Sequence, residues 1–371
     1  MTGTGVLADT TIRAMIASGA ISADSAVADA QVQPASLDLR LGAVAYRVRA
    51  SFLAGKGRSV ADRIAEFEMH RIDLDGGAVL EKGCVYVVPL SERLALPEGV
   101  TAVANAKSST GRLDLLTRTI TDGGEEFDRI PDGYQGPLYA EICPRSFSVL
   151  VRPGMRLNQI RFRNGQAVLD DRTLTELHAR SALVTGKALI SEGLGFSVDL
   201  SPARGDLVGY RAKPHTGVID LDQIGRYEPA EFWEEVRSRE ARIILDPGAF
   251  YILVSREAVT IPPDYAAEMA PYLAMVGEFR VHYAGFFDPG FGWAEAGGAG
   301  SRGALEVRCH EAPLVLAHGQ VRAPLAYERI ADHPAQPDRD GTPTTYRGLG
   351  LTLPNHSSMT SGRAAHPPPS L

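Results

Sequence analysis

The chain has 371 residues, of which 44% are apolar and 22% are charged, a balance typical of globular proteins with a substantial core. Its formal net charge of −7 excludes a broad electrostatic surface for nucleic acid or membranes, but it allows a local basic pocket for one polyanionic ligand. Three widely spaced cysteines without a Cys-x-x-Cys pair indicate free thiols rather than disulfides or a zinc site. No apolar run reaches the roughly 20 residues that span a bilayer, and we expect a cytoplasmic protein.

The first predicted element is a short N-terminal helix. Residues 10–18 carry apolar side chains at helical spacing, with Asp9 before them as a cap and Gly19 after them as a stop. Beyond this helix, short runs rich in Val, Ile, Leu and Tyr alternate with Gly, Pro and Asp, which is typical of a β-barrel or β-sandwich. Residues 229–240 are the other helix candidate. The expected fold class is therefore mostly β, with few helices.

The sequence contains an internal repeat. At one constant offset, residues 80–97 align with residues 245–262, and a glycine, a tyrosine, a glutamate and a proline of the two segments coincide. Two copies of one β-domain are the simplest explanation. We expect a first β-domain over residues 1–166, a connecting segment over 167–205 and a second, more divergent β-domain over 206–331. Residues 332–371, rich in Pro, Gly, Ser and Thr, are expected to form a tail.

A turn that follows an apolar run of the first copy carries groups that bind phosphate. It comprises Lys107, Ser108, Ser109 and Arg112. Hydroxyls, backbone N–H groups and guanidinium groups are suitable donors to phosphate oxygens. At the repeat offset, the second copy has Tyr, Leu, Ala and Gly in these positions. Because the second copy is expected to share the fold without these polar residues, the turn is better explained as a ligand site of the first copy than as a structural turn.

Two polar residues further along the first copy are candidates for chemistry or binding. Glu141 lies in an otherwise apolar run that follows a turn at residues 131–133. Its carboxylate is either on the solvated face of an edge strand, or in a pocket where burial raises its pKa into the range used for proton transfer. Gln159 is either an amide donor to a ligand or a surface strand residue. Strand sequence alone leaves these alternatives open.

Taken together, the motifs resemble the 2′-deoxycytidine triphosphate deaminase family, within the superfamily of trimeric dUTP nucleotidohydrolases. In chain order they are residues 33–42, 107–112, 129–136, 141 and 152–155. The resemblance covers about residues 7–164, and the doubled length resembles the long, tandem form of that deaminase. It implies two tandem dUTPase-like β-barrel or jelly-roll domains. It also implies a homo-oligomer, a trimer or trimer-based, with sites between subunits.

The resemblance also implies roles for single residues. Glu141 would be the catalytic carboxylate that takes a proton from water, delivers one to N3 of cytosine and assists the departure of ammonia, while Ser108 and Arg112 position the water. Lys107 and Ser109 would lie near the triphosphate, and residues 129–134 near the deoxyribose. The tail around residue 346 resembles a segment that folds over the phosphates. The substrate-binding candidates are Lys107, Ser109, Arg129, Asp132, Gly133, Tyr134, Gln159, Tyr346 and Arg347.

No catalytic metal is expected. Zinc deaminases hold their metal with a His-x-Glu and a Pro-Cys-x-x-Cys pattern, and the sequence contains neither. Deamination would then depend on a carboxylate and oriented hydrogen bonds. The resemblance implies Mg²⁺ only as a companion of the triphosphate.

The function that the sequence favours is hydrolytic deamination of dCTP to dUTP and ammonia, which supplies deoxyuridine nucleotides for dTTP synthesis. One alternative is a dUTP diphosphatase, or a bifunctional enzyme that continues to dUMP, for which an aspartate has to activate water near the phosphates; Asp132 is the candidate considered, and the sequence leaves its role open. Another alternative is a non-catalytic nucleotide-binding regulator. Glu306 lies in the second copy, which lacks the polar turn. We therefore expect that copy to be a structural or oligomer-completing module.

Overall fold

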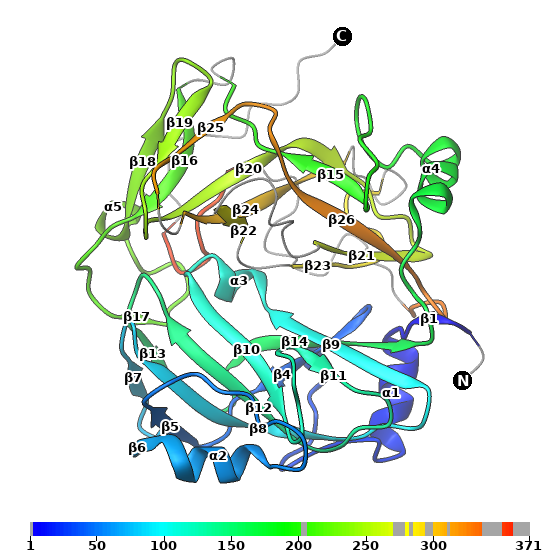
Figure 1. Cartoon of the computed structure of the whole chain (residues 1–371), viewed down its shortest axis with the longest axis vertical. Coiled ribbons are helices and arrows are strands. Elements are labelled where there is room, and N and C mark those ends of the chain that lie inside the picture. Colours follow the sequence, from blue (N-terminus) through cyan, green and yellow to red (C-terminus); the bar gives the residue numbers. More distant parts are fainter. Residues whose placement is uncertain are drawn as a thin grey trace.

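The computed structural model describes residues 3–201, 206–269, 279–281, 285–293, 300–309, 312–335 and 351–358, with only the backbone given for 279–281 and 321–323. Figure 1 shows two β-rich lobes, one built by each repeat, with the short helix α3 (Ser108–Gly111) at their junction. The structure is mostly β, which confirms the expected fold class.

Two antiparallel six-stranded sheets form the first lobe. One has the order β11-β9-β14-β4-β3, with β1 added to β14, and the other has the order β10-β12-β8-β5-β6, with β2 added to β8. The strands of the first sheet are β1 (Gly5–Val6), β3 (Val32–Gln33), β4 (Ser36–Arg40), β9 (Val100–Ala106), β11 (Arg129–Ile130) and β14 (Arg156–Asn164). The strands of the second are β2 (Ile21–Ala23), β5 (Val44–Val48), β6 (Glu68–Asp73), β8 (Val85–Ala95), β10 (Leu115–Thr121) and β12 (Gln135–Pro144).

The second lobe repeats this plan. Among the described residues its two larger sheets have the orders β15-β26-β21-β23 and β18-β16-β20-β24-β22. Their strands are β15 (Leu194–Ser197), β16 (Leu207–Ala212), β18 (Trp233–Arg237), β20 (Phe250–Val259), β21 (Tyr265–Met269), β22 (Phe279–Val281), β23 (Phe286–Phe287), β24 (Ser301–Cys309) and β26 (Val321–Arg329). The pair β20 and β24 lies at the repeat offset from β8 and β12, and it is paired in the same antiparallel way.

Each lobe also carries a small ribbon of strands. The ribbon of the first lobe is formed by β7 (Ala78–Leu80) and β13 (Val149–Val151), and β17 (Ile219–Asp220) of the second half of the chain adds to it in parallel. The ribbon of the second lobe is formed by β19 (Arg242–Leu245) and β25 (Leu314–Ala317). The strand β17 therefore ties the second half of the chain to the first lobe.

The helices agree only in part with the sequence-based expectation. Helix α1 (Asp9–Ala17) is the predicted N-terminal helix, although its cap position is Ala8 rather than Asp9. Helix α2 (Val60–Phe67), helix α4 (Asp171–Arg180) and the 3₁₀ helix η1 (Asp29–Gln31) were not anticipated. Both α2 and α4 begin at side-chain caps, because the Ser59 hydroxyl accepts from Asp62 N–H and the Asp170 carboxylate accepts from Thr173 N–H.

The expectation of a helix over residues 229–240 is wrong. Helix α5 spans only Pro229–Phe232, and the chain then forms strand β18, which pairs with β16. Phe232 and Trp233 pack edge-on against Phe147 of the first lobe. This packing and the backbone hydrogen bonds of the ladder outweigh the helix propensity of the glutamate-rich sequence that follows.

Residues 167–205, expected as a connecting segment, contribute structure to the second lobe. Strand β15 pairs with β26, and α4 places Leu174 and Leu177 in the same core as Phe196 of β15. The second lobe therefore starts earlier in the chain than the sequence suggested.

A buried arginine joins the two lobes. Arg161 of β14 is fully buried, and its Nη1 lies 2.9 Å from Glu328 Oε2 of β26 and donates to the Ala267 carbonyl of β21 at 2.9 Å. Its guanidinium also lies over the ring of Phe286, 4.1 Å from the ring centroid. A charge buried in this way is stable only when it is paired and hydrogen-bonded, so the contact fixes how the lobes meet.

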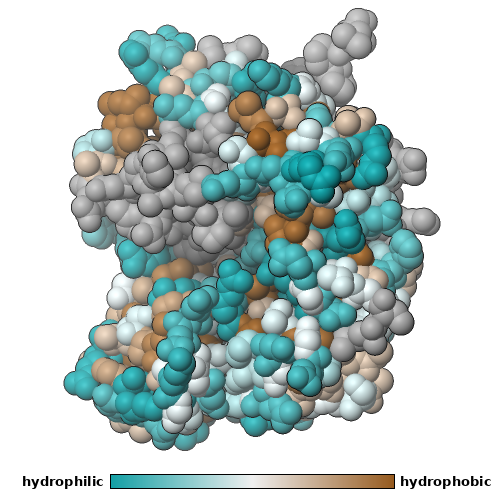
Figure 2. Space-filling model, turned by 45° about the vertical axis from the view of Figure 1, so that its right-hand side comes forward, coloured by the Kyte–Doolittle hydropathy of each residue, from teal (hydrophilic) through white to brown (hydrophobic). Residues whose placement is uncertain are grey.

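All three cysteines are free thiols, as the sequence predicts. Figure 2 shows that on one face of the molecule the hydrophobic side chains of the described residues lie in separate patches among hydrophilic ones. Among the described residues, no helix has the length and apolar character needed to cross a membrane.

Candidate active site

The polar turn predicted from the sequence folds as α3, directly after β9. The Lys107 carbonyl accepts from the N–H groups of Thr110 and Gly111 at 2.9 Å, which closes one helical turn. Lys107 N–H and the Thr110 hydroxyl both donate to the Leu157 carbonyl of β14, at 2.9 and 3.0 Å. These bonds fix the turn to two strands of the first lobe, so its side chains are held in place by backbone contacts rather than by a flexible loop.

A cavity of about 90 Å³ lies beside α3, where the two lobes meet. The first lobe contributes Ser108 and Arg112 to its lining, and the second lobe contributes Phe286, Phe291 and Glu306. We call this space the inter-repeat cavity. It combines a hydroxyl, a guanidinium and a carboxyl group with aromatic walls, which are the components expected of a small-molecule site.

Strand alternation on β24 places Glu306 in this cavity. Leu305 and Val307 point into the core of the second lobe, so Glu306 between them points to the opposite face, toward the first lobe. The residue is 6% exposed, and Arg112 Nε lies 3.8 Å from its Oε1. Burial raises the pKa of Glu306 to about 8, although the nearby Arg112 guanidinium lowers it. A carboxyl group with this pKa exchanges protons readily near neutral pH.

Arg112 is held from several directions. It is 4% exposed, its Nε faces Glu306, and its Nη1 donates to the Thr352 hydroxyl of the C-terminal segment at 2.7 Å. Asp114, which lies two positions after Arg112, forms an ion pair with Arg308 of β24. The Ser146 hydroxyl donates to the same Asp114 carboxylate at 2.6 Å. The end of α3 is therefore fastened to the strand that carries Glu306.

Glu141, the predicted catalytic residue, has different surroundings. It lies on β12 opposite Arg118 of β10, and Arg118 donates to its Oε1 from Nη2 at 2.5 Å and from Nε at 3.1 Å. The Arg118 guanidinium also stacks on Phe127, 3.6 Å from the ring centroid. Glu141 is 1% exposed, so it is the buried alternative rather than the solvated one. Within this chain, however, the carboxylate that lines the cavity beside Ser108 and Arg112 is Glu306 and not Glu141.

The predicted deoxyribose contacts also lie away from α3 within this chain. Arg129 lies opposite Val103 in the middle of β9. Asp132 lies at the start of this strand, where its carboxylate accepts from Gly99 N–H at 2.6 Å, whereas α3 follows the end of the seven-residue strand, about 20 Å away at the usual rise per residue. The Tyr134 hydroxyl donates to the Pro137 carbonyl at 2.7 Å, and Gly133 occupies the turn with φ +63°. Arg129 pairs with Glu126 at 3.6 Å on the surface. The equivalent segment of the second repeat, which contains Phe286 and Phe291, is the one that lines the inter-repeat cavity.

Lys107 and Ser109 line a second cavity, of about 470 Å³. Arg152, Arg156 and His356 also contribute to it. We call it the basic cavity. The consecutive residues Ser108 and Ser109 of α3 therefore line different cavities, and Thr110 lines the basic cavity together with Ser109.

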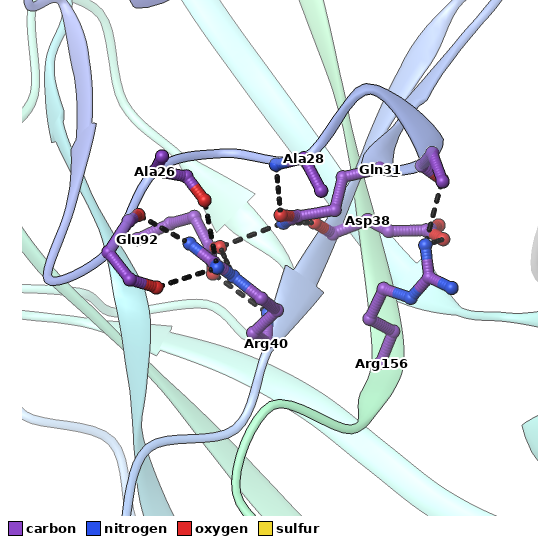
Figure 3. Close-up of polar contacts among 9 residues, drawn as sticks. Ala26, Ala28, Gln31, Asp38, Arg40, Glu92 and Arg156 are labelled. Carbon is purple, nitrogen blue, oxygen red and sulfur yellow. Dashed lines mark hydrogen bonds and ion pairs between the residues drawn. The ribbon is translucent and has the colours of Figure 1, made fainter.

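A buried polar network supports the basic cavity. Lys107 forms an ion pair with Asp38 of β4, and Arg156 Nη1 lies 3.5 Å from the same carboxylate. Burial raises the pKa of Asp38, and the Lys107 ammonium opposes that rise. Figure 3 shows how Gln31 connects Asp38 to Glu92. Its side-chain amide donates to the Asp38 backbone carbonyl and to the Glu92 carboxylate, both at 2.9 Å. The motif at residues 33–42 therefore acts by placing the carboxylate that holds Lys107.

Of the remaining predicted substrate-binding residues, the structure describes Gln159 but not the two in the tail. Gln159 lies on β14 and donates to the Asn105 side chain of β9 at 2.9 Å, close to the end of the strand that leads into α3. Tyr346 and Arg347 lie outside the described residues. The described segment 351–358 that follows them lies against the site, with Thr352 on Arg112 and His356 in the basic cavity.

Sequence reasoning missed Glu306, Phe286 and Thr352 as site residues. Glu306 had a usable signal, because it is the residue that the repeat offset aligns with Glu141. The absence of the polar turn from the second copy hides this signal, because it makes that copy look purely structural. The structure shows that the turn of one copy and the carboxylate of the other meet in one cavity.

Two protein-family models match the chain. The model of the 2′-deoxycytidine 5′-triphosphate deaminase N-terminal domain matches residues 3–166, and that of the C-terminal domain of the same protein matches residues 170–357. The crystal structure of 2′-deoxycytidine 5′-triphosphate deaminase from Agrobacterium tumefaciens is similar with a TM-score of 0.85 and 55% identity, over 88% of this chain and 99% of that one.

Curated relatives are similar over a shorter part of the chain. The dUMP-forming dCTP deaminase of Beutenbergia cavernae is 32% identical over 158 residues, which are 42% of this chain and 78% of the relative. The dCTP deaminase of Haloarcula marismortui is 29% identical over 136 residues, which are 36% of this chain and 67% of the relative.

Proposed function

The chain belongs to the 2′-deoxycytidine 5′-triphosphate deaminase family, whose two domain models match its two halves, and from this membership we propose that it deaminates dCTP in the inter-repeat cavity. The activity is a hydrolysis in which water replaces the 4-amino group of cytosine. The observation that carries the assignment of the site is the position of Glu306 beside Arg112 in a cavity that Ser108 also lines.

In the proposed mechanism, Glu306 moves the protons. Its carboxylate accepts a proton from water as the water oxygen attacks C4, and the resulting carboxylic acid delivers this proton to N3. The C4–N bond then breaks, the second proton of the water moves to the departing amino group, and the products are a uracil ring and ammonia. General acid–base catalysis of this kind contributes on the order of 10²–10⁴-fold, and the rest comes from orientation.

Ser108 and Arg112 orient the reacting groups in this proposal. The Ser108 hydroxyl is suited to fix the attacking water, and the Arg112 guanidinium stabilises the ionised form of Glu306 that accepts the first proton. Phe286 and Phe291 provide apolar walls against which the pyrimidine ring packs. These walls also exclude bulk water, which strengthens the interaction between the charged groups.

We propose that the triphosphate, as its Mg²⁺ complex, binds in the basic cavity. Lys107, Arg152 and Arg156 surround this space, and Ser109 adds a hydroxyl donor. The adjacent positions of Ser108 and Ser109 in α3 support a nucleotide that reaches both cavities, with its base in one and its phosphates in the other.

The test compares two matched variants, Glu306→Gln and Glu141→Gln, by measuring ammonia release from dCTP. We expect Glu306→Gln to lose at least about 10²-fold in kcat. We expect Glu141→Gln to retain turnover if it stays folded, because Glu141 is paired with Arg118 outside the cavity. Full turnover by Glu306→Gln would exclude the mechanism, and loss by a well-folded Glu141→Gln would return the catalytic role to Glu141.

We propose dUTP as the product, and dUMP is the second candidate because the Beutenbergia cavernae relative is named as dUMP-forming. The Asp132 carboxylate, the group considered for activating a second water, caps Gly99 N–H at 2.6 Å instead. Measuring pyrophosphate together with ammonia separates the two cases. Ammonia without pyrophosphate supports dUTP, whereas equal amounts of both identify the dUMP-forming reaction.

We further propose a cytoplasmic homo-oligomer, trimeric or trimer-based, that supplies deoxyuridine nucleotides for dTTP synthesis. Three free thiols are consistent with a reducing compartment. The oligomeric state rests on the family resemblance, and light scattering of the purified protein measures it directly. A mass equal to one chain would contradict this proposal.

A further inference from the structure

The C-terminal segment 351–358 is docked on the first lobe next to the inter-repeat cavity. Leu351 and Leu353 pack against the hydrophobic cluster that contains the core of the first lobe and adjoining residues such as Phe232 and Trp233. Further along, the Asn355 carbonyl accepts from Gly225 N–H at 2.8 Å and the His356 carbonyl accepts from Tyr227 N–H at 3.0 Å. The segment is therefore held by apolar packing on one side and by backbone hydrogen bonds on the other.

One side chain of this segment contacts the proposed catalytic machinery. The Thr352 hydroxyl accepts from Nη1 of Arg112 at 2.7 Å, while Nε of the same guanidinium lies 3.8 Å from Glu306. A guanidinium is planar and rigid, so fixing one of its nitrogens restricts the direction in which the others point. Thr352 thus fixes one nitrogen of the guanidinium group whose Nε faces Glu306.

We propose that Thr352 is a positioning residue for deamination, whose hydroxyl holds the Arg112 guanidinium against Glu306. This inference rests on the proposed function of the inter-repeat cavity. It assigns the C-terminal segment a role in the catalytic arrangement itself, in addition to any role in covering the substrate. Without the hydroxyl, the long arginine side chain has more rotamers available and loses a hydrogen bond to a charged group.

Substituting Thr352 removes the hydroxyl without undocking the segment. Valine has nearly the shape of threonine, and the anchoring bonds of Asn355 and His356 use backbone carbonyls that the substitution does not touch. Serine restores the hydroxyl. Ser358 is the matched control in the same segment, because its hydroxyl donates to Glu228 at 3.1 Å on the surface and contacts neither cavity.

The experiment measures kcat, KM for dCTP and the pH profile of kcat for Thr352→Val, Thr352→Ser and Ser358→Ala. We expect Thr352→Val to lower kcat on the order of tenfold to a hundredfold, with a much smaller change in KM. We also expect its pH profile to shift to higher pH, because a carboxylate that loses a nearby positive charge is harder to ionise. Thr352→Ser should recover most of kcat, and Ser358→Ala should match the parent enzyme.

Two results would overturn the inference. One is a Thr352→Val enzyme with the parental kcat and pH profile while Glu306→Gln is inactive, which leaves the proposed function intact. The other is an equal loss in Thr352→Val and Ser358→Ala, which would assign the effect to docking of the segment rather than to the hydroxyl. Turnover that survives Glu306→Gln would instead contradict the proposed function itself.

Discussion

Glu141 and Glu306 occupy equivalent positions in the two repeats, but each faces a different arginine. Glu141 accepts two hydrogen bonds from Arg118, its cross-strand neighbour in the same lobe. Glu306 lies 3.8 Å from Arg112 of the other lobe, beside a cavity. Arg118 binds Oε1 of Glu141, whose Oε2 is buried without a hydrogen-bond partner among the described residues, whereas the Glu306 carboxylate lines a cavity in which it can meet a ligand. The predictions below depend on this difference.

The pH dependence of turnover should report the pKa of Glu306, which burial raises to about 8. Below this pH the carboxyl group is mainly protonated and cannot accept the proton of water. We therefore expect kcat/KM for dCTP to rise by about tenfold per pH unit up to about pH 8 and then to level off. Steady-state assays from about pH 6 to about pH 9 measure the profile. A profile that is flat over this range would contradict the assignment.

Removing Arg118 should affect stability more than catalysis. Arg118→Met leaves the buried Glu141 carboxylate without its ion-pair partner, and we expect a loss of about 1–3 kcal/mol in the free energy of unfolding, since Arg118 is partly exposed. The double variant Arg118→Met, Glu141→Gln should recover part of this loss because no charge is left buried. Denaturant titration measures both. A large fall in kcat at unchanged stability would show that the pair serves catalysis instead.

The buried Arg161 should be among the most sensitive positions for the contact between the lobes. It pairs with Glu328, which is also fully buried and which Arg163 contacts as well, so Arg161→Met removes one of two cations from this carboxylate. It also removes the guanidinium that donates to two buried carbonyls, and we expect a cost of about 1–3 kcal/mol of stability. Arg172→Met is the control, because Arg172 forms an exposed pair with Glu176 and should change stability by less than about 0.5 kcal/mol. Thermal unfolding of the two variants tests the contrast, and similar values for both would refute it.

Asp128 should make stability depend on pH. Burial raises the pKa of Asp128 to about 7. The hydrogen bond that its carboxylate accepts from Thr119 N–H and the positive charge of Arg118 both lower this pKa, but by less than burial raises it. Because this folded-state pKa lies above the unfolded value, the contribution of Asp128 to stability is fully present in acid and is lost as the pH rises from about 4 to about 7. Asp128→Asn cannot ionise, and asparagine tolerates the φ of +61° at this position. We expect this variant to gain stability over the parent above about pH 7, with the gain disappearing in acid.

The two serines of α3 should have separable kinetic effects. Ser109 lines the basic cavity, so Ser109→Ala should raise KM for dCTP several-fold and leave kcat nearly unchanged. Ser108 lines the inter-repeat cavity, so Ser108→Ala should mainly lower kcat. Initial-rate measurements over a range of dCTP concentrations distinguish these outcomes. Identical kinetic changes in both variants would argue against separate sites for the base and the phosphates.

Much of the fold could be predicted from local sequence patterns. The helix α1, the β-rich composition and the tandem repeat all follow from periodicity and from comparing the chain with itself. The comparison of the two copies also identified the polar turn as more than a structural element. The structure places that turn at a cavity between the lobes.

Pairings between distant parts of the chain could not be predicted in the same way. Strand alternation shows that Glu306 leaves the core of its own lobe, but not that the facing surface is α3 of the other lobe. That outcome depends on how the lobes pack, through contacts such as Arg161 with Glu328. The contact of Thr352 with Arg112 joins residues that are 240 positions apart and has no local signature. For residues 229–240, the ladder with β16 outweighed local helix propensity.

The peptide chain itself links the turn that carries Arg112 to the strand that carries Glu306, and this has a consequence for enzyme concentration. Two groups joined by one chain meet at an effective concentration that the geometry of the linkage sets, not the amount of protein in solution. Dilution therefore does not separate this pair, as it would if the two groups belonged to dissociable subunits. The linkage also lets the copies diverge, since each has to keep only its own half of the arrangement.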